Sequence, residues 1–210
     1  MNNADATPKK LNLGCGFNKY EGYVNVDSAP ECKPDIVWDL EKTPWPWEDN
    51  SVEEIKLEHV LEHLGQTTEQ YLAIWKEMWR VCKNGALIDM TVPHWNHENF
   101  HHDPTHVRAI TPVGIAMFDQ LRNIQNAEAG GRETKLGLFT GVDIALDEKD
   151  IEYFYSGDIV QALSRGEFTR EGLEHLRSHQ NNISNEIRMK ARVIKPVRGT
   201  QWLRDNGYAG

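Results

Sequence analysis

The chain has 210 residues, a length typical of one large domain. Hydrophobic residues make up 39% and charged residues 26%, so the composition is that of a folded protein and excludes a disordered chain. The net charge of −9 disfavours a nucleic-acid partner, and no apolar run is long enough to span a membrane. Three cysteines without metal-ligand spacing favour a reducing compartment, and we expect the cytoplasm.

The first half of the chain alternates short apolar runs with loops. Residues 1–10 are polar, and we expect them to be flexible. Apolar runs predict strands over 11–16, 23–27, 35–40 and 51–59. Helical spacing of apolar residues predicts helix over 60–85, split at Gly65 and stopped by Asn84-Gly85. The run that follows predicts a central strand over 85–94.

The second half is more polar and less regular. A histidine-rich loop is expected over 95–112, and Thr-Pro then begins a helix over 111–123. The pattern predicts a strand over 151–156, a polar helical stretch over 157–180 that Gly166 and Gly172 interrupt, and a long strand over 185–196. Residues 124–149 and 197–210 stay unassigned. Strands that alternate with helices and loops indicate one α/β domain over 1–210 with a mostly parallel sheet.

The first three predicted strands each end in residues suited to binding a nucleoside. Gly14-Cys15-Gly16 ends the first strand, Asp27 the second and Asp39 the third. Ligands of parallel sheets bind beyond the carboxyl ends of the strands. Glycine allows close approach to the backbone, and carboxylates accept hydrogen bonds from ribose hydroxyls or an adenine amine. One aspartate at a strand end is usually a turn residue, but the three features together predict an adenosine site.

The glycine run excludes two common phosphate-binding loops. GCGFNKYEG lacks the third glycine of a dinucleotide fingerprint, and the segment before the next strand is too short for a full helix. No GxxxxGK[ST] run is present either. The pattern therefore favours an adenosine cofactor without phosphate.

The segments LNLGCG, VNVD, DIVWDL, WPWEDNSVEEI and HVLEHL, in this order, resemble class I S-adenosylmethionine-dependent methyltransferases of the type 11-like group. The resemblance covers residues 11–94, and the rest is similar to a bacterial and phage subgroup of unassigned substrate. It implies a Rossmann-like, mostly parallel seven-stranded sheet with helices on both faces and an antiparallel last strand pair. One departure is the short segment after the glycines, where most members have a full helix.

The resemblance also implies the cofactor S-adenosyl-L-methionine and a role for each matching residue. It implies that Gly14, Cys15 and Gly16 lie along the methionine part and ribose, and that Asp27 binds the ribose hydroxyls. Asp39, with the backbone of Leu40, would contact adenine. Glu58 and His59, at the end of the fourth strand, would line the methionine part and sulfonium.

Trp45 and Trp47 flank a proline beside the expected adenine loop. One of them is suited to stack on the base, and the equally favoured alternative is that both pack beneath the edge of the sheet. His63 likewise has two interpretations, since it either faces the cleft or caps the start of a helix.

Residues 93–108 follow the fifth predicted strand and belong to the same sheet edge. A neutral imidazole is suited to take a proton from a hydroxyl or amine, so we expect the catalytic residues among His94, His102, Asp103 and His106. Histidines and carboxylates also bind metals, but HExxH spacing is absent and we assign no metal ligand. Hydrogen bonds that fix the loop are the third interpretation.

The sequence therefore predicts an enzyme that transfers a methyl group to an O or N acceptor, a small molecule or glycan, by in-line displacement. Alignment of the reactants supplies most of such catalysis. Residues 95–112 and 124–182 are expected to form acceptor-site loops or a lid. The alternatives are a non-catalytic methyltransferase-like binding or adaptor subunit and a metalloenzyme that uses the histidines of 94–106. Acceptor and oligomeric state are not specified.

Overall fold

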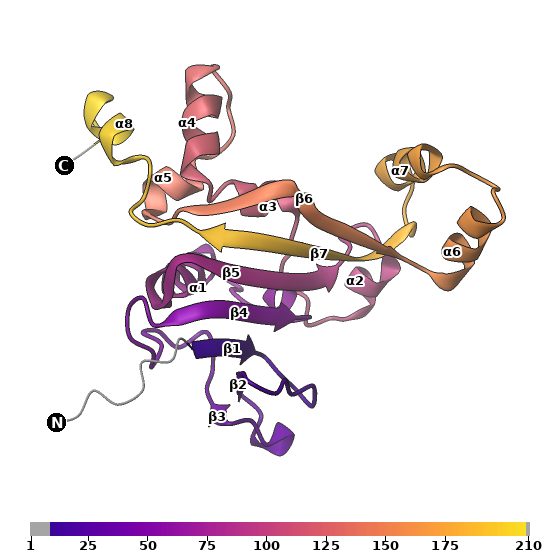
Figure 1. The fold of residues 1–210 in the computed structure, drawn as a ribbon, viewed down its shortest axis with the longest axis horizontal. Helices are drawn as coiled ribbons and strands as arrows, with labels where there is room; N and C mark the ends of the chain where they lie inside the picture. Colours follow the sequence, from indigo (N-terminus) through magenta and orange to yellow (C-terminus); the bar gives the residue numbers. More distant parts are fainter. Residues whose placement is uncertain (1–8, 209–210) are drawn as a thin grey trace.

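A computed structural model describes residues 9–208. Seven strands form one sheet in the order β3-β2-β1-β4-β5-β7-β6 (Figure 1). Strands β1 to β5 pair in parallel, and β7 is antiparallel to both β5 and β6. The predicted mostly parallel sheet with an antiparallel last pair is confirmed. Its strands are β1 (Lys9–Leu13), β2 (Val24–Asp27), β3 (Ile36–Val37), β4 (Val52–Glu58), β5 (Cys82–Pro93), β6 (Ile144–Tyr155) and β7 (Ser184–Val193).

The helices are short apart from the one between β4 and β5. They are η1 (Pro30–Cys32), η2 (Leu61–His63), α1 (Thr68–Val81), α2 (Glu98–His102), α3 (Pro112–Ala116), α4 (Gln120–Glu128), α5 (Leu136–Thr140), α6 (Gly157–Ser164), α7 (Arg170–His179) and α8 (Thr200–Asp205). None in the described part is long and apolar enough to cross a membrane.

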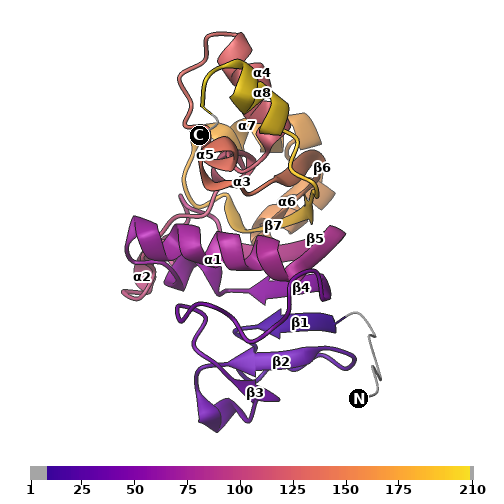
Figure 2. The ribbon, with the colours of Figure 1, turned by 90° about the vertical axis from the view of Figure 1, so that its left-hand side faces the viewer.

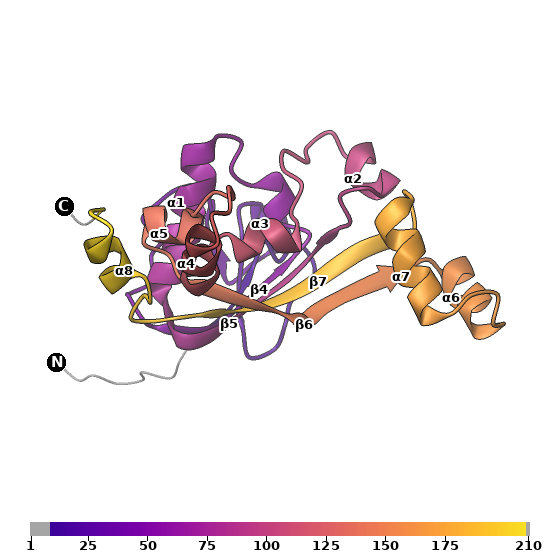
Figure 3. The same cartoon turned by 90° about the horizontal axis from the view of Figure 1, so that it is seen from above.

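The two faces of the sheet differ in polarity. Ile88, Met90 and Val92 of β5 are buried on the face that α1 and α3 cover (Figures 2 and 3). On the opposite face Arg188 binds Asp89 through two hydrogen bonds of 2.8 and 2.5 Å. Alternate residues of a strand point to opposite faces, so this apolar-polar alternation decides which side takes the helices.

Helices were expected on both faces, and here the distribution is unequal. Within residues 9–208 only a loop joins β1 to β2, and only the short η1 lies between β2 and β3. No helix of the described chain lies over the polar face of β1, β4 and β5 (Figures 1 and 3). Charged side chains that pair with each other keep that face compatible with water.

The predicted split at Gly65 is confirmed, but both ends of the helical stretch predicted over 60–85 are wrong. A 3-10 turn occupies 61–63, and α1 begins only after Thr67, whose hydroxyl accepts a hydrogen bond from the backbone N–H of Gln70 while the Gln70 side chain caps in return. This reciprocal capping box is a strong start signal. The helix ends at Val81, and Asn84-Gly85 lies inside β5 instead of stopping the helix.

Other boundaries also move. Over 157–180 the predicted interruption at Gly166, whose φ is +73°, is confirmed, since it separates α6 from α7, but Gly172 lies inside α7 and does not interrupt it. The helix over 111–123 is likewise divided into α3 and α4, and the expected loop 95–112 contains α2. The unassigned stretches hold α4, α5, the first half of β6 and, near the end, α8.

The expected flexible segment 1–10 overlaps the first strand. Lys9 and Lys10 belong to β1, and residues 1–8 lie outside the described part. The expected lid range 124–182 includes β6, which is part of the sheet. Outside the sheet this range consists of α4 and α5 at one end of β6 and of α6 and α7 at the other (Figure 1).

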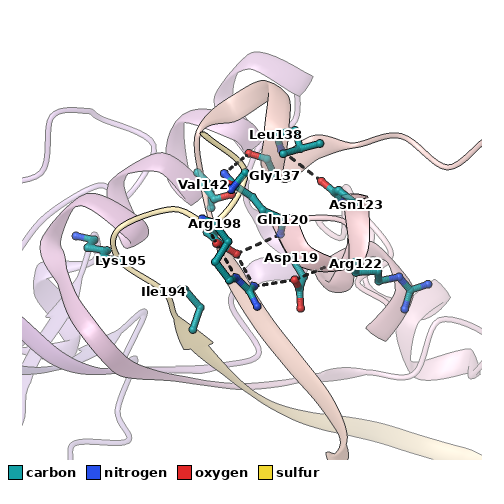
Figure 4. Close-up of polar contacts among 12 residues, drawn as sticks. Asp119, Gln120, Arg122, Asn123, Gly137, Leu138, Val142, Ile194, Lys195 and Arg198 are labelled. Carbon is teal, nitrogen blue, oxygen red and sulfur yellow. Dashed lines mark hydrogen bonds and ion pairs between the residues drawn. The ribbon is translucent and has the colours of Figure 1, made fainter. Parts of the chain in front are cut away.

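A buried ion pair fastens the C-terminal segment to the sheet (Figure 4). Asp143, which is fully buried just before β6, accepts hydrogen bonds from the Arg198 guanidinium at 2.9 and 2.7 Å. Arg198 also reaches Asp119 at 2.7 Å, and the Gln120 side chain accepts from the N–H of Gly199 at 2.7 Å. These bonds join the start of α4, the start of β6 and residues 198–199.

Candidate functional site

The site lies at the sheet edge where the parallel strands end. Two cavities of about 250 and 630 Å³ adjoin there and share Gly14 and His59. The first is lined by Gly14, Asp27, Ser28, Asp39, Leu40, His59, Val60, His63 and Leu64. The second is lined by Gly14, Cys15, Gly16, Phe17, Asn18, Glu58, His59, Thr91 and Glu186. All eight residues that the sequence assigned to a cofactor site therefore line one cavity or the other.

The turn after β1 depends on glycine. Gly14 has φ +64°, and a Cβ at this position would lie 2.5 Å from Cγ2 of Val60, the residue before η2. A side chain would therefore meet both backbone strain and a steric clash. Gly16 donates its backbone N–H to Asp27 Oδ2 at 2.7 Å, which holds the turn against the end of β2.

The two aspartates line the first cavity from neighbouring strand ends. Asp27 Oδ1 accepts from the N–H of Ala29 at 2.9 Å, and Asp39 Oδ1 accepts from the N–H of Glu41 at 3.0 Å. These local bonds orient both carboxylates. A carboxylate has about four acceptor positions, so each retains capacity for a ligand hydroxyl or amine.

His59 stands between the two cavities with a left-handed backbone, φ +54°. Its Nε2 lies 3.2 Å from Glu186 Oε1 and its Nδ1 lies 3.4 Å from Glu62 Oε1. The neighbouring carboxylates, Glu186 first and then Glu62, raise the pKa of His59 to about 10. The ring is therefore cationic at neutral pH and forms a charged boundary between the cavities.

The sequence analysis missed two residues of this site. Glu186 reaches His59 because β7 pairs antiparallel with β5, which sets Glu186 opposite Pro93. Tyr20 donates its hydroxyl to Glu58 at 2.8 Å, and Lys56 Nζ lies 2.9 Å from the same carboxylate. No local motif marks either residue, since their position depends on the strand pairing and on the loop between β1 and β2.

The two tryptophans belong to the core. Trp45 and Trp47 are 3% and 4% exposed and meet edge to face with ring centroids 5.8 Å apart. Stacking on a base is therefore wrong, and the alternative of internal packing is confirmed. Trp45 Nε1 donates to the carbonyl of Leu40 at 3.0 Å, so it fixes the backbone next to Asp39.

The residues expected near the acceptor do not lie together. His94 is fully buried, stacks on Trp95 with centroids 4.0 Å apart and lines neither cavity. Burial lowers the pKa of His94 to about 4. His102 and Asp103 line a separate open depression of about 450 Å³. His106 instead packs against His63, with ring centroids 4.6 Å apart.

Two further histidines resolve open interpretations. His63 lines the first cavity, and the cap of α1 is Thr67, so His63 faces the cleft. His97 caps α2 by accepting the N–H of Asn99 at Nδ1, 3.1 Å away, which is the loop-fixing role. Among the residues that the structure describes, the one group with metal-ligand spacing is Glu62, His63 and His106. Of the five histidines in 94–106, it contains His106 alone.

No known protein family and no curated protein matches the sequence. Among solved structures, the chain is similar to an S-adenosylmethionine-dependent methyltransferase from Archaeoglobus fulgidus, with 16% identity and a TM-score of 0.55 over 88% of this chain and 85% of that one. Another from Mesorhizobium loti has 16% identity and a TM-score of 0.46 over 88% and 90%. The first similarity shows the fold: a Rossmann-like methyltransferase sheet.

Proposed function

We propose that the chain is an S-adenosylmethionine-dependent methyltransferase that modifies an oxygen or nitrogen atom of a small molecule or glycan. The observation that carries the proposal is the convergence of the glycine turn, Asp27 and Asp39 on two adjoining cavities at the sheet edge. In open α/β sheets this edge is where ligands bind. The fold of the Archaeoglobus methyltransferase supports the same cofactor class.

The two cavities divide the cofactor between them. In the first cavity, Asp27 accepts hydrogen bonds from the ribose hydroxyls, and Asp39 with the backbone of Leu40 contacts adenine. In the second, the bare backbone of Gly14 and Gly16 lies along the methionine part. Because His59 is held between two carboxylates, its charge suits the carboxylate end of the methionine part better than the sulfonium.

The bound cofactor supplies a methyl group on a good leaving group, so the protein contributes mainly alignment, worth up to about 7–11 kcal/mol in near-attack geometry. Because His63 lines the first cavity and His106 packs on it, we propose that the acceptor binds beside these two rings. An imidazole there is suited to take the proton of a hydroxyl acceptor. His94 is neutral and buried against Trp95, so we assign it a structural role in the loop after β5 instead of contact with the acceptor.

The test is formation of S-adenosylhomocysteine from S-adenosylmethionine with panels of sugars, phenols and amines as acceptors. We expect acceptor-dependent product with one class, and none with the Asp27→Ala variant. Asp147→Ala, at an exposed position in β6, is the matched control and retains activity. Tight cofactor binding with no product from any acceptor class would favour the non-catalytic adaptor instead.

A further inference from the structure

Glu62 is a buried carboxylate without hydrogen-bond donors. It lies in η2 with no exposed surface, and neither of its oxygens accepts a hydrogen bond from any residue that the structure describes. His59 Nδ1 is 3.4 Å from Oε1, a distance that gives an ion pair without good hydrogen-bond geometry. His59 approaches Oε1 alone, so Oε2 of this buried carboxylate has no partner among the described residues, and a second cation would complete it.

Two imidazoles stand beside this carboxylate. The backbone carbonyl of Glu62 accepts hydrogen bonds from the N–H groups of Val107 at 2.8 Å and Arg108 at 3.2 Å, which brings the preceding residue, His106, next to His63. One ligand atom from each of Glu62, His63 and His106 lies within 4.8 Å of the other two. The three residues thus converge from η2 and from the loop after α2.

The hydrogen bonds around the two rings fix their tautomers. His106 Nδ1 lies 2.7 Å from the carbonyl oxygen of Phe100, which can only accept, so Nδ1 carries the proton. His63 Nδ1 lies 2.9 Å from the hydroxyl oxygen of Thr105, whose own proton goes to Asp103 at 2.6 Å. That hydroxyl therefore accepts from His63 Nδ1. Both Nε2 atoms keep a free lone pair, as metal-ligating histidines with such outer partners do.

We propose that Glu62, His63 and His106 bind a divalent transition-metal ion of the Zn²⁺ type. Two imidazoles and one carboxylate suit Zn²⁺, whereas Mg²⁺ and Ca²⁺ prefer oxygen ligands. In tetrahedral geometry two ligand atoms of one zinc lie about 3.4 Å apart, so side-chain movements of up to about 1.4 Å bring the present arrangement, which lies within 4.8 Å, to that spacing. Three protein ligands leave a coordination position open, and His63 places the site at the wall of the first cavity.

The site gives His106 a role different from proton acceptor. As a ligand it keeps its lone pair on the metal and no longer acts as a base. Asp103 Oδ2, 3.8 Å from His106 Nε2, adds a second carboxylate at the edge of the site. Metal binding here does not depend on the cofactor, so it is measurable whether or not the chain transfers methyl groups.

The experiment uses the full-length protein without an affinity tag, freed of metal by a chelator and titrated with Zn²⁺ against a chromogenic competitor. We expect one ion per chain and no measurable competition by Mg²⁺. Glu62→Gln and His106→Gln each weaken Zn²⁺ affinity by at least about 100-fold, beyond the 10–100-fold typical of outer-shell losses. His101→Gln, an exposed neighbour on α2, is the matched control and binds as the wild type does.

Thermal unfolding provides the second measurement. Zn²⁺ raises the Tm of the wild type and of His101→Gln but leaves Glu62→Gln and His106→Gln unchanged. The Tm without metal shows whether each variant folds. If Glu62→Gln does not fold, the Zn²⁺ affinity of His106→Gln tests the proposal. Wild-type affinity in both variants overturns the proposal. Loss of binding in His175→Gln overturns it too, since that result moves the ion to the stacked His175–His179 pair on α7.

Discussion

At the residue scale, the geometry of the glycine turn is the most constrained feature of the proposed cofactor site. Gly14 has a left-handed backbone and lies against Val60, so a side chain at this position would cause both backbone strain and a steric clash. Asp27 is constrained in another way, because its carboxylate already accepts two backbone N–H groups and thereby faces the cavity. Both residues lie within the first 30, and local sequence was sufficient to find them.

Replacing Gly14 by alanine should disrupt the turn. The variant meets about 1–2 kcal/mol of left-handed strain and the clash with Val60, so we expect a lower Tm and at least a 10-fold loss of S-adenosylmethionine affinity. Gly130→Ala is the control, because that glycine has φ +72° but no neighbour within 4 Å and lies away from both cavities. Equal cofactor affinity in the two variants would contradict the assigned role of the turn.

Removing the Asp27 carboxylate tests the ribose position. Asp27→Ala leaves two ribose hydroxyls without an acceptor, and we expect a loss of about 2–4 kcal/mol in cofactor binding, roughly 30- to 1,000-fold in Kd. Calorimetry measures the affinity, and circular dichroism checks that the turn keeps its structure. An unchanged Kd in a folded variant would rule out Asp27 as the ribose ligand.

His94 predicts a pH dependence of stability. Its pKa is lowered to about 4 in the fold and is about 6.5 when the chain unfolds. The unfolded state therefore binds more protons in this window, and stability is lost as the pH falls from about 6.5 towards 4. His94→Phe keeps an aromatic ring against Trp95 without ionising. We expect the free energy of unfolding, measured by urea denaturation, to decrease less steeply in this variant as the pH falls from about 6.5 to 4. Identical pH slopes in variant and wild type would show that His94 does not titrate this way.

At the element scale, the sequence located strands better than helix boundaries. Alternation in β7 and the apolar runs of β1, β4 and β5 are strong local signals, because each strand has one face in the core. The glycines that break the two helical stretches were found, and the errors lie in where each helix begins and ends. Gly65 and the Thr67 capping box divide 60–85, and Gly166 divides 157–180, although the spacing alone is helical on both sides.

The C-terminal segment is an element that a buried ion pair, among other bonds, attaches to the start of β6. Arg198→Ala leaves the fully buried Asp143 without its guanidinium, and we expect a loss of about 3 kcal/mol in the free energy of unfolding. Arg204→Ala, at an exposed position on α8, is the control and should change stability by under about 0.5 kcal/mol. Chemical denaturation compares the two, and equal stabilities would mean that Asp143 is held mainly by backbone donors.

At the scale of the whole molecule, the sheet order explains why half of the site was predictable. Residues of β1, β2 and β4 reach the cavities through short segments of one region of the chain, so motifs reveal them. Glu186 and His106 arrive from distant segments, through strand pairing and through the loop bound to η2. A single sequence contains no signal for such long-range contacts. The polar sheet face without a helix follows from the short connections after β1 and β2.

The measurement that tests the central claim most directly is calorimetric titration of the purified protein with S-adenosylmethionine and S-adenosylhomocysteine, with NAD as the control. The account predicts micromolar binding of both sulfur compounds at one site per chain and no heat from NAD. Absence of binding by either compound to well-folded protein would contradict the assignment of the two cavities to this cofactor.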